Sequence, residues 1–174
     1  MSLIYEPAED SFLFKEFLQE YFADIDNSKS KILEMGCGSC ILSETLRDLG
    51  FTEILCADIN KDAVNLAKKL GFNAIQTDLF ENIKEKFDYI IFNPPYLPKD
   101  PLEDEESSLI TTGGEKGDEI IVKFLKQTQN FLNDSGKIFV LISSLTPTKN
   151  LGKYKIVARK KIFCEELFIL EFDN

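Results

Sequence analysis

Histidine is absent from the 174 residues of this chain. Without histidine the chain lacks Ser-His-Asp and Cys-His catalysis, and it lacks the side chain that most often moves protons near neutral pH. Any catalysis must therefore use other side chains or the backbone.

Basic residues are scarce relative to acidic ones. The chain has 20 lysines and arginines against 30 aspartates and glutamates, which gives a net charge of −10. Nucleic-acid binding draws much of its free energy from lysine and arginine neutralising phosphates. The charge therefore argues against a nucleic-acid partner and favours a protein or small-molecule substrate.

Long apolar runs are also missing. None approaches the length of a membrane span, and the opening Met1–Glu6 lacks the basic and apolar regions of a signal peptide. We therefore expect a cytoplasmic protein with no membrane-spanning segment. A length of 174 residues suits one domain with a full core, here residues 1–174.

The chain has four cysteines, and only Cys37 and Cys40 stand close together, as C-x-x-C. A structural zinc site usually needs four ligands, but Cys56 and Cys164 are isolated and histidine is absent. The pair also lies inside a glycine turn rather than in a thioredoxin-like context. We expect four reduced, small, mostly buried side chains and no metal ligands.

Helix and strand signals alternate along the chain. Residues 7–22 carry apolar side chains at spacings of three and four, with acids Glu9 and Asp10 in the first turn, as a helix dipole favours. Strands are then predicted at 31–35, 53–57, 73–77, 87–92 and 137–142, helices at 41–49, 62–70 and 118–132, a polar loop at 99–115, and two final strands within 154–172. This order predicts an α/β fold, with a mostly parallel sheet, helices on both faces and an antiparallel C-terminal hairpin.

Polar residues and glycines follow four of the predicted strands, where open α/β sheets bind their ligands. They are Glu34, Gly36 and Gly38, then Asp58, then Asp78, then Asn93–Tyr96. We expect all four sets to face one crevice.

The glycine turn after the first strand indicates a nucleotide-type cofactor. A dinucleotide fingerprint would need glycine at position 41, which is Ile41, so a dehydrogenase is disfavoured. The pattern Glu34-x-Gly36-x-Gly38 suits a cofactor with an amino acid end. Glu34 would act on the cationic methionine moiety through water or the backbone.

Two acids at strand ends can hold the rest of such a cofactor. Asp58 lies 20 residues after Gly38, where it can accept both ribose hydroxyls. Asp78 can accept a hydrogen bond from the adenine amino group, with Leu79 and Phe80 near the ring. The alternative is that both acids only cap helices. The matched strand ends favour the cofactor.

Asn93-Pro94-Pro95-Tyr96 carries the strongest chemical signal. An amide or aromatic amine nitrogen is a poor nucleophile because its lone pair is delocalised. The Asn93 side-chain oxygen and the Pro94 carbonyl can accept both of its N–H bonds, which directs lone-pair density toward a methyl donor. The prolines make the turn rigid before the substrate arrives, and Tyr96 can stack on a flat substrate group. A simple proline turn is the alternative.

These features resemble the HemK/PrmC group of protein glutamine methyltransferases over nearly the whole chain. That group methylates the glutamine of the Gly-Gly-Gln motif in class 1 translation release factors, with S-adenosyl-L-methionine as cofactor. The opening Tyr5–Ser11 is similar to that of the eukaryotic and archaeal branch, and Glu165-Glu166-Leu167 resembles the closing hairpin. The resemblance implies a Rossmann-like class I methyltransferase fold, with cofactor contacts at Ser11, Glu34, Gly36, Asp58, Asp78, Leu79 and Asn93.

The chain departs from the family pattern in three places. Some 30 residues precede the first predicted strand, so we expect that the N-terminal helical domain of bacterial members is absent. Cys40 replaces the last glycine of the family's glycine motif. Asp118 stands where the family usually has arginine, which affects the expected substrate contacts there.

The eukaryotic branch works with a small zinc-binding activator protein, so the resemblance implies a heterodimer here. The predicted strand 73–77 gives independent support, because it should lie at an uncovered sheet edge that can pair with another chain. Around Phe72–Thr77, Phe72 and Ile75 could anchor this partner or could be ordinary core residues.

Two other functions stay open. An adenine-N6 methyltransferase acting on DNA or RNA would use the same Asn93–Tyr96 chemistry, because adenine N6 is also a conjugated amine. A noncatalytic scaffold would only bind the cofactor or a partner, which the intact tetrapeptide argues against. The acidic charge and the opening segment favour glutamine methylation.

Overall fold

The computed structural model describes residues 4–26, 29–99, 111–163 and 165–173. The elements are, in chain order, α1 (Glu9–Tyr21), β1 (Lys31–Met35), α2 (Ile41–Asp48), β2 (Glu53–Asp58), α3 (Lys61–Lys69), β3 (Asn73–Gln76), β4 (Phe87–Phe92), α5 (Glu119–Thr128), the 3-10 turn η1 (Gln129–Phe131), β5 (Leu132–Ser143), β6 (Lys155–Ile162) and β7 (Glu165–Asp173). No helix within the described ranges is long and apolar enough to cross a membrane.

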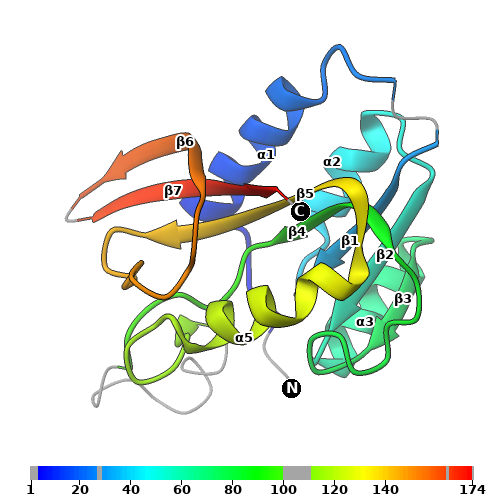
Figure 1. Ribbon diagram of the computed structural model, residues 1–174. Coiled ribbons are helices and arrows are strands. Elements are labelled where there is room, and N and C mark those ends of the chain that lie inside the picture. The colour runs from blue at the N-terminus through cyan, green and yellow to red at the C-terminus, as the bar shows by residue number, and fades with distance from the viewer. Residues whose placement is uncertain (1–3, 27–28, 100–110, 164, 174) are drawn as a thin grey trace.

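The strands form one seven-stranded sheet in the order β3-β2-β1-β4-β5-β7-β6 (Figure 1). Neighbours from β3 through β5 run parallel. β7 runs antiparallel to both β5 and β6. The predicted parallel sheet with an antiparallel hairpin at its C-terminal end is therefore confirmed.

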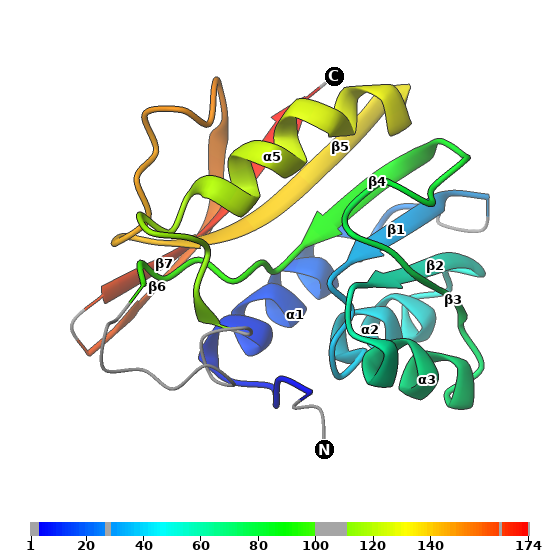
Figure 2. The same ribbon diagram turned by 90° about the horizontal axis from the view of Figure 1, so that it is seen from below.

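Helices cover both faces of this sheet, as predicted. In Figure 1, α1 and α2 lie on the upper side and α5 on the lower side, and Figure 2 shows α5 running along β5. Successive strand residues point to opposite faces. Ile32 belongs to a buried cluster with residues of α1, α2 and α3, whereas Leu33 belongs to a second cluster with residues of α5 and with Phe80. The inner strands β1 and β4 are mostly buried on both faces, which is why their sequences read as nearly continuous apolar runs. The outer strands β3 and β6 are more exposed.

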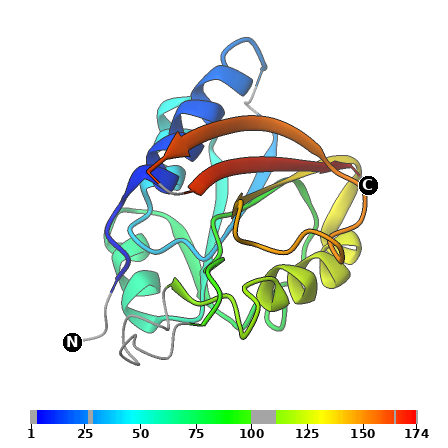
Figure 3. The ribbon, with the colours of Figure 1, turned by 90° about the vertical axis from the view of Figure 1, so that its left-hand side faces the viewer.

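Aromatic rings fix α1 on its face of the sheet. The Phe139 ring of β5 lies 5.0 Å from Phe17 and 4.9 Å from Tyr21, both edge to face. Phe22 makes a similar contact with Tyr89 of β4 at 4.8 Å. Figure 3 shows the start of α1 beside the end of β6, where an ion pair joins Glu9 to Lys160.

The main difference from the predicted elements lies between α5 and β5. The helix predicted for 118–132 ends at Thr128, and the strand predicted for 137–142 begins at Leu132. Leu132 is buried and pairs with Phe87 at the start of β4, which lengthens the ladder. The polar residues 133–136, which resemble a turn, are accommodated by a register shift between Phe87 and Tyr89. Strand pairing overrides the local sequence signal here.

We expect Phe139→Ala to lower the free energy of unfolding by about 3–5 kcal/mol, because it leaves a cavity under α1. Urea unfolding followed by far-UV circular dichroism measures the change. Phe163→Ala is the matched control, since this ring is fully exposed, and it should shift stability by no more than about 0.5 kcal/mol. Equal losses in the two variants would contradict the proposed packing of α1.

Candidate active site

The predicted site residues follow the carboxyl ends of the strands. β1 pairs in register with both neighbours, so that Met35 lies opposite Ala57 of β2 and Phe92 of β4. Because all three strands run parallel, Gly36, Asp58 and Asn93 follow at the same end. Open α/β sheets bind their ligands at this carboxyl end of the strands.

Backbone hydrogen bonds tie the glycine turn to β2. The Gly36 and Cys37 amides both donate to the Ala57 carbonyl, at 2.7 and 3.2 Å. Gly36 has a φ of 65°, and a Cβ there would lie 3.1 Å from the Phe92 ring, so both conformation and space favour glycine. At Gly38, a Cβ would meet no described atom within 4 Å. The backbone at Gly38 is therefore open to a ligand.

Asp58 holds this turn through its side chain. One carboxylate oxygen accepts the Gly38 amide at 2.9 Å, and the other accepts the Asn60 amide at 2.8 Å. Asn60, rather than Asp58, caps α3 by accepting from the Asp62 amide. Burial raises the pKa of Asp58 above its ordinary value, although the amides oppose this shift. Each carboxylate oxygen has a further lone pair for a ligand hydroxyl.

Glu34 lies on the opposite side of the turn, against α2. Its carboxyl group is buried and accepts a short hydrogen bond from the Ser43 hydroxyl. Burial is the largest influence and raises the pKa of Glu34 well above its ordinary value. The Glu34 carboxyl group therefore binds Ser43 of α2, and any effect on a ligand's amino group would pass through the backbone or water.

Asp78 and Leu79 lie beyond the end of β3. The Asp78 carboxylate forms an ion pair with Lys123 of α5 at 2.9 Å, and both side chains are largely exposed. Leu79 is buried with a φ of 50°, and its carbonyl accepts from the Thr77 hydroxyl at 3.0 Å. An adenine amino group at Asp78 would share the carboxylate with Lys123.

Asn93 has an unused hydrogen-bond acceptor. Its side-chain nitrogen donates to Asp10 Oδ2 at 3.1 Å. Since an ionised carboxylate only accepts, this contact fixes which end of the amide faces Asp10. The other end, Asn93 Oδ1, is buried and has no hydrogen-bond partner among the residues that the structure describes. Such a group is costly to leave unpaired and indicates a site for a further hydrogen-bond donor.

Asp10 is the residue that sequence reasoning missed. It was assigned only to the helix dipole, but its buried carboxylate also accepts from the Tyr5 hydroxyl at 3.0 Å and the Ser11 amide at 2.6 Å. The Ser11 hydroxyl, a predicted cofactor contact, lies 3.3 Å from the same carboxylate. The available signal was the segment Tyr5–Ser11, in which Asp10 sits between two polar groups that it binds.

The Asn93–Tyr96 turn is supported by the segment around Gly113. The Gly113 amide donates to the Leu97 carbonyl at 2.9 Å, and a Cβ on Gly113 would lie 2.7 Å from the Pro95 carbonyl oxygen. The Tyr96 carbonyl accepts from the Thr146 hydroxyl at 3.1 Å. Tyr96 itself is half-buried, and burial raises the pKa of its phenol. The turn is thus braced before a substrate binds.

Asp118, which stands where the family usually has arginine, has a hydrogen-bond partner in the structure. The Asp118 side chain is buried and accepts from the Asn150 amide at 3.3 Å. The predicted loop at 99–115 is described only at its ends, because residues 100–110 lie outside the described ranges.

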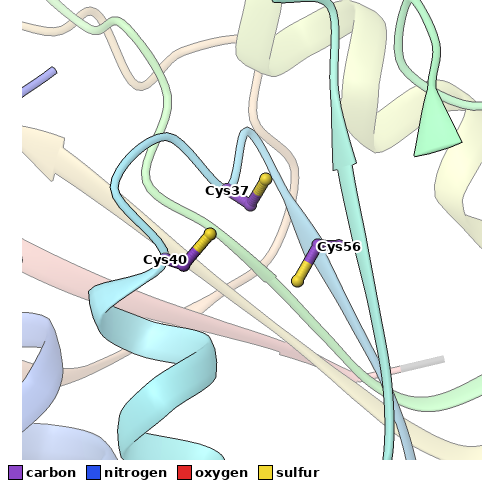
Figure 4. A group of neighbouring side chains, drawn as sticks. All are labelled: Cys37, Cys40 and Cys56. Atoms are coloured by element: carbon purple, nitrogen blue, oxygen red, sulfur yellow. The ribbon is translucent and has the colours of Figure 1, made fainter. Parts of the chain in front are cut away.

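The expectation that Cys56 is isolated is wrong. Parallel pairing of β1 with β2 brings Cys56 beside the glycine turn, and the Cys37, Cys40 and Cys56 sulfur atoms all lie within 4.8 Å of one another (Figure 4). These three cysteines are free and buried, as predicted. Cys164 lies outside the described residues.

Comparison with known proteins identifies the family. The sequence profile of the methyltransferase small domain matches residues 14–165. The chain belongs to this family. It is 37% identical to a protein of Methanocaldococcus jannaschii provisionally named a protein N5-glutamine methyltransferase, over 96% of this chain and 90% of that protein. It is 29% identical to the methyltransferase HEMK2 of Homo sapiens, over 79% of this chain and 71% of that protein.

A bacterial relative and two solved structures are also similar to this chain. The release factor glutamine methyltransferase of Lactococcus lactis is 28% identical over 74% of this methyltransferase chain and 53% of its own length. A 16S rRNA methyltransferase of T. thermophilus, solved with AdoMet and guanosine, has a TM-score of 0.69 and 17% identity over 99% of this chain and 44% of its own. A ribosomal protein methylase from Lactobacillus delbrueckii has a TM-score of 0.65 and 16% identity, over 97% of this chain and 80% of its own. These structures confirm the class I methyltransferase fold.

We expect Glu34→Gln to change the pH dependence of stability. In the folded chain Glu34 stays protonated above its ordinary pKa because it is buried, whereas in the unfolded chain it ionises. Raising the pH through this window therefore lowers wild-type stability relative to the Gln variant by up to about 1.4 kcal/mol per pH unit. Urea titrations from mildly acidic to mildly alkaline pH measure it. A difference that does not vary with pH would show that Glu34 is not perturbed.

Proposed function

We propose that this methyltransferase transfers a methyl group from S-adenosyl-L-methionine to the side-chain amide nitrogen (N5) of a glutamine. The acceptor is the glutamine of the Gly-Gly-Gln motif in a class 1 translation release factor. The observation that carries the proposal is the buried Asn93 Oδ1, which has no hydrogen-bond partner within the described ranges and lies at the strand ends beside the cofactor turn. The relatives named for protein glutamine methylation support the substrate.

The residues at the crevice suit this cofactor. The open backbone at Gly38 admits close approach, Asp58 keeps lone pairs for ribose hydroxyls, and Asp78 can accept from the adenine amino group beside Leu79. Ser11 and Gly36 complete the proposed contacts, and Glu34 supports the turn from the core side. When bound, S-adenosyl-L-methionine supplies an electrophilic methyl group.

Asn93 and Pro94 prepare the nitrogen. A glutamine amide carries two N–H donors, which Asn93 Oδ1 and the Pro94 carbonyl can accept. An unpaired buried acceptor costs about 1–3 kcal/mol, which a substrate N–H removes on binding. Both hydrogen bonds favour lone-pair density perpendicular to the amide plane, toward the methyl donor. No histidine is required, because the amide proton becomes acidic as the nitrogen gains its methyl group.

Rigid placement supplies the remaining catalysis. The braced turn Asn93–Tyr96 holds the nitrogen, and the glycine turn holds the donor. Such alignment can lower the activation barrier by about 7 kcal/mol or more in favourable cases. Tyr96 offers a flat, half-buried ring on which the planar amide can stack.

A small zinc-binding activator protein is the second proposed partner. β3 lies at the edge of the sheet, with β2 as its neighbour. Phe72 packs into the core beneath the Arg47 guanidinium at 4.6 Å, and Ile75 is partly buried. The outer side of the β3 backbone, where the Gln76 carbonyl already accepts from the Asn82 side chain at 3.1 Å, therefore offers the docking feature more than these two side chains do.

Methyl transfer from labelled S-adenosyl-L-methionine tests the function. The acceptors are a class 1 release factor, the same factor with its Gly-Gly-Gln glutamine changed to alanine, and unmethylated DNA, each with and without the activator. We expect label on the unaltered factor alone, increased by the activator. Asn93→Ala should lower the rate by about 10²–10³-fold, as is typical for loss of one preorganised polar group. Label on DNA alone would instead assign the chain to adenine-N6 methylation.

We also expect Asp10→Asn to lower kcat by about tenfold, because the Asn93 amide is then free to turn over and present its nitrogen to the substrate. The dissociation constant of S-adenosyl-L-methionine, measured by titration calorimetry, should stay the same. Glu9→Gln is the matched control, since Glu9 is an exposed acid on the same helix that pairs with Lys160. An unchanged kcat in Asp10→Asn would show that Asp10 does not position Asn93.

A further inference from the structure

Three cysteine side chains converge beneath the glycine turn. Cys37 and Cys40 belong to the turn after β1, and Cys56 belongs to the neighbouring strand β2 (Figure 4). Their sulfur atoms lie within 4.8 Å of one another, and all three residues are buried. Three sulfurs bound to one trigonal metal ion at about 2.3 Å would lie about 4.0 Å apart. A contraction of less than an ångström would therefore form a site.

The left-handed backbone at Cys40 is expected if a sulfur atom is required at this position. Cys40 has a φ of 67°, in the left-handed region that disfavours any residue with a Cβ. Glycine would relieve this conformation, yet the chain carries a cysteine there. The Cys40 amide donates to the Cys37 carbonyl at 2.7 Å, which closes the C-x-x-C loop and keeps both side chains on the same side of the turn as Cys56.

The surroundings favour a thiolate at this position. Cys40 is the N-cap of α2, where the helix dipole stabilises negative charge.

We propose that Cys37, Cys40 and Cys56 form a binding site for one soft, thiophilic metal ion. Within the described part of the chain, no fourth histidine, cysteine, aspartate or glutamate joins the three sulfurs, and the Ser43 hydroxyl lies 3.1 Å from Cys56 Sγ. Three sulfur donors in a dry site suit Cu⁺, which accepts three ligands, ahead of Zn²⁺, which would need a fourth. Each ligating thiol releases its proton to solvent on binding. The bound ion would join the turn to β2 on the side away from the crevice.

Metal loading under anaerobic conditions tests the site. The full chain is unfolded in the presence of a chelator. Separate samples are then refolded with excess Cu⁺ or with excess Zn²⁺, desalted, and analysed for bound metal. Wild type should retain one ion per chain, and X-ray absorption should count three sulfurs around Cu⁺. The retained ion should also raise Tm. Retention of Zn²⁺ in preference to Cu⁺, still dependent on all three cysteines, would support the site and assign it the other ion.

Cys40→Gly is the decisive variant, because it removes one sulfur and also relieves the left-handed backbone. We expect it to fold with an apo Tm at or above that of wild type, and to bind metal at least roughly tenfold more weakly. Cys56→Ala should weaken binding in the same way, whereas Cys164→Ser should bind as wild type does. The proposal is overturned if wild type retains neither ion, if it forms a disulfide without taking up metal, or if Cys40→Gly binds as tightly as wild type. None of these outcomes depends on the methyl acceptor.

Discussion

Parallel pairing of β1 with both β2 and β4 determines where everything at the candidate site lies. The register places the last residues of the three strands side by side, so the residues that follow them meet at one edge. Asp58 then uses its position to accept the Gly38 amide. A carboxylate from one strand thus holds the turn of the next. A register shift would separate the turn, the acid and Asn93 at once.

Apolar packing of α1 against the sheet places a polar group, the Asp10 carboxylate, at the candidate site. Phe17, Tyr21 and Phe22 hold α1 against β4 and β5, and this places Asp10 next to Asn93. The aromatic contacts that hold α1 in place therefore also determine the orientation of the Asn93 amide. Under the proposed mechanism, burial of α1 therefore serves catalysis by placing Asp10 beside Asn93.

The glycine turn has two chemically different sides. Toward the crevice, Gly36 and Gly38 leave the backbone accessible, and Asp58 fixes its course. Toward the core lie the three thiols and the hydrogen-bonded pair of Glu34 and Ser43, all removed from water. Changes in protonation or ligation on the buried side can reach the cofactor side through the same few backbone atoms.

Local sequence signals were sufficient for the elements and for most of the site. The bounds of β1 and β4 were predicted as found, because short apolar runs punctuated by glycine, aspartate and asparagine mark buried parallel strands. The edge position of β3 is expected from the fold that the resemblance implies, and the antiparallel end is expected from the order of elements. The motif Asn93–Tyr96 signalled its chemistry because those residue types have few other uses at a strand end.

Contacts between distant segments were decided only by the tertiary structure. Asp10 and Asn93 are 83 residues apart, and no local pattern reveals that one orients the other. Cys56 is isolated in the sequence and joins Cys37 and Cys40 only through strand pairing. The early start of β5 has the same cause, since a ladder partner on β4 outweighs the turn signal of the intervening residues. Residue types and periodicity thus specified which groups are present, and three-dimensional packing specified which of them act together.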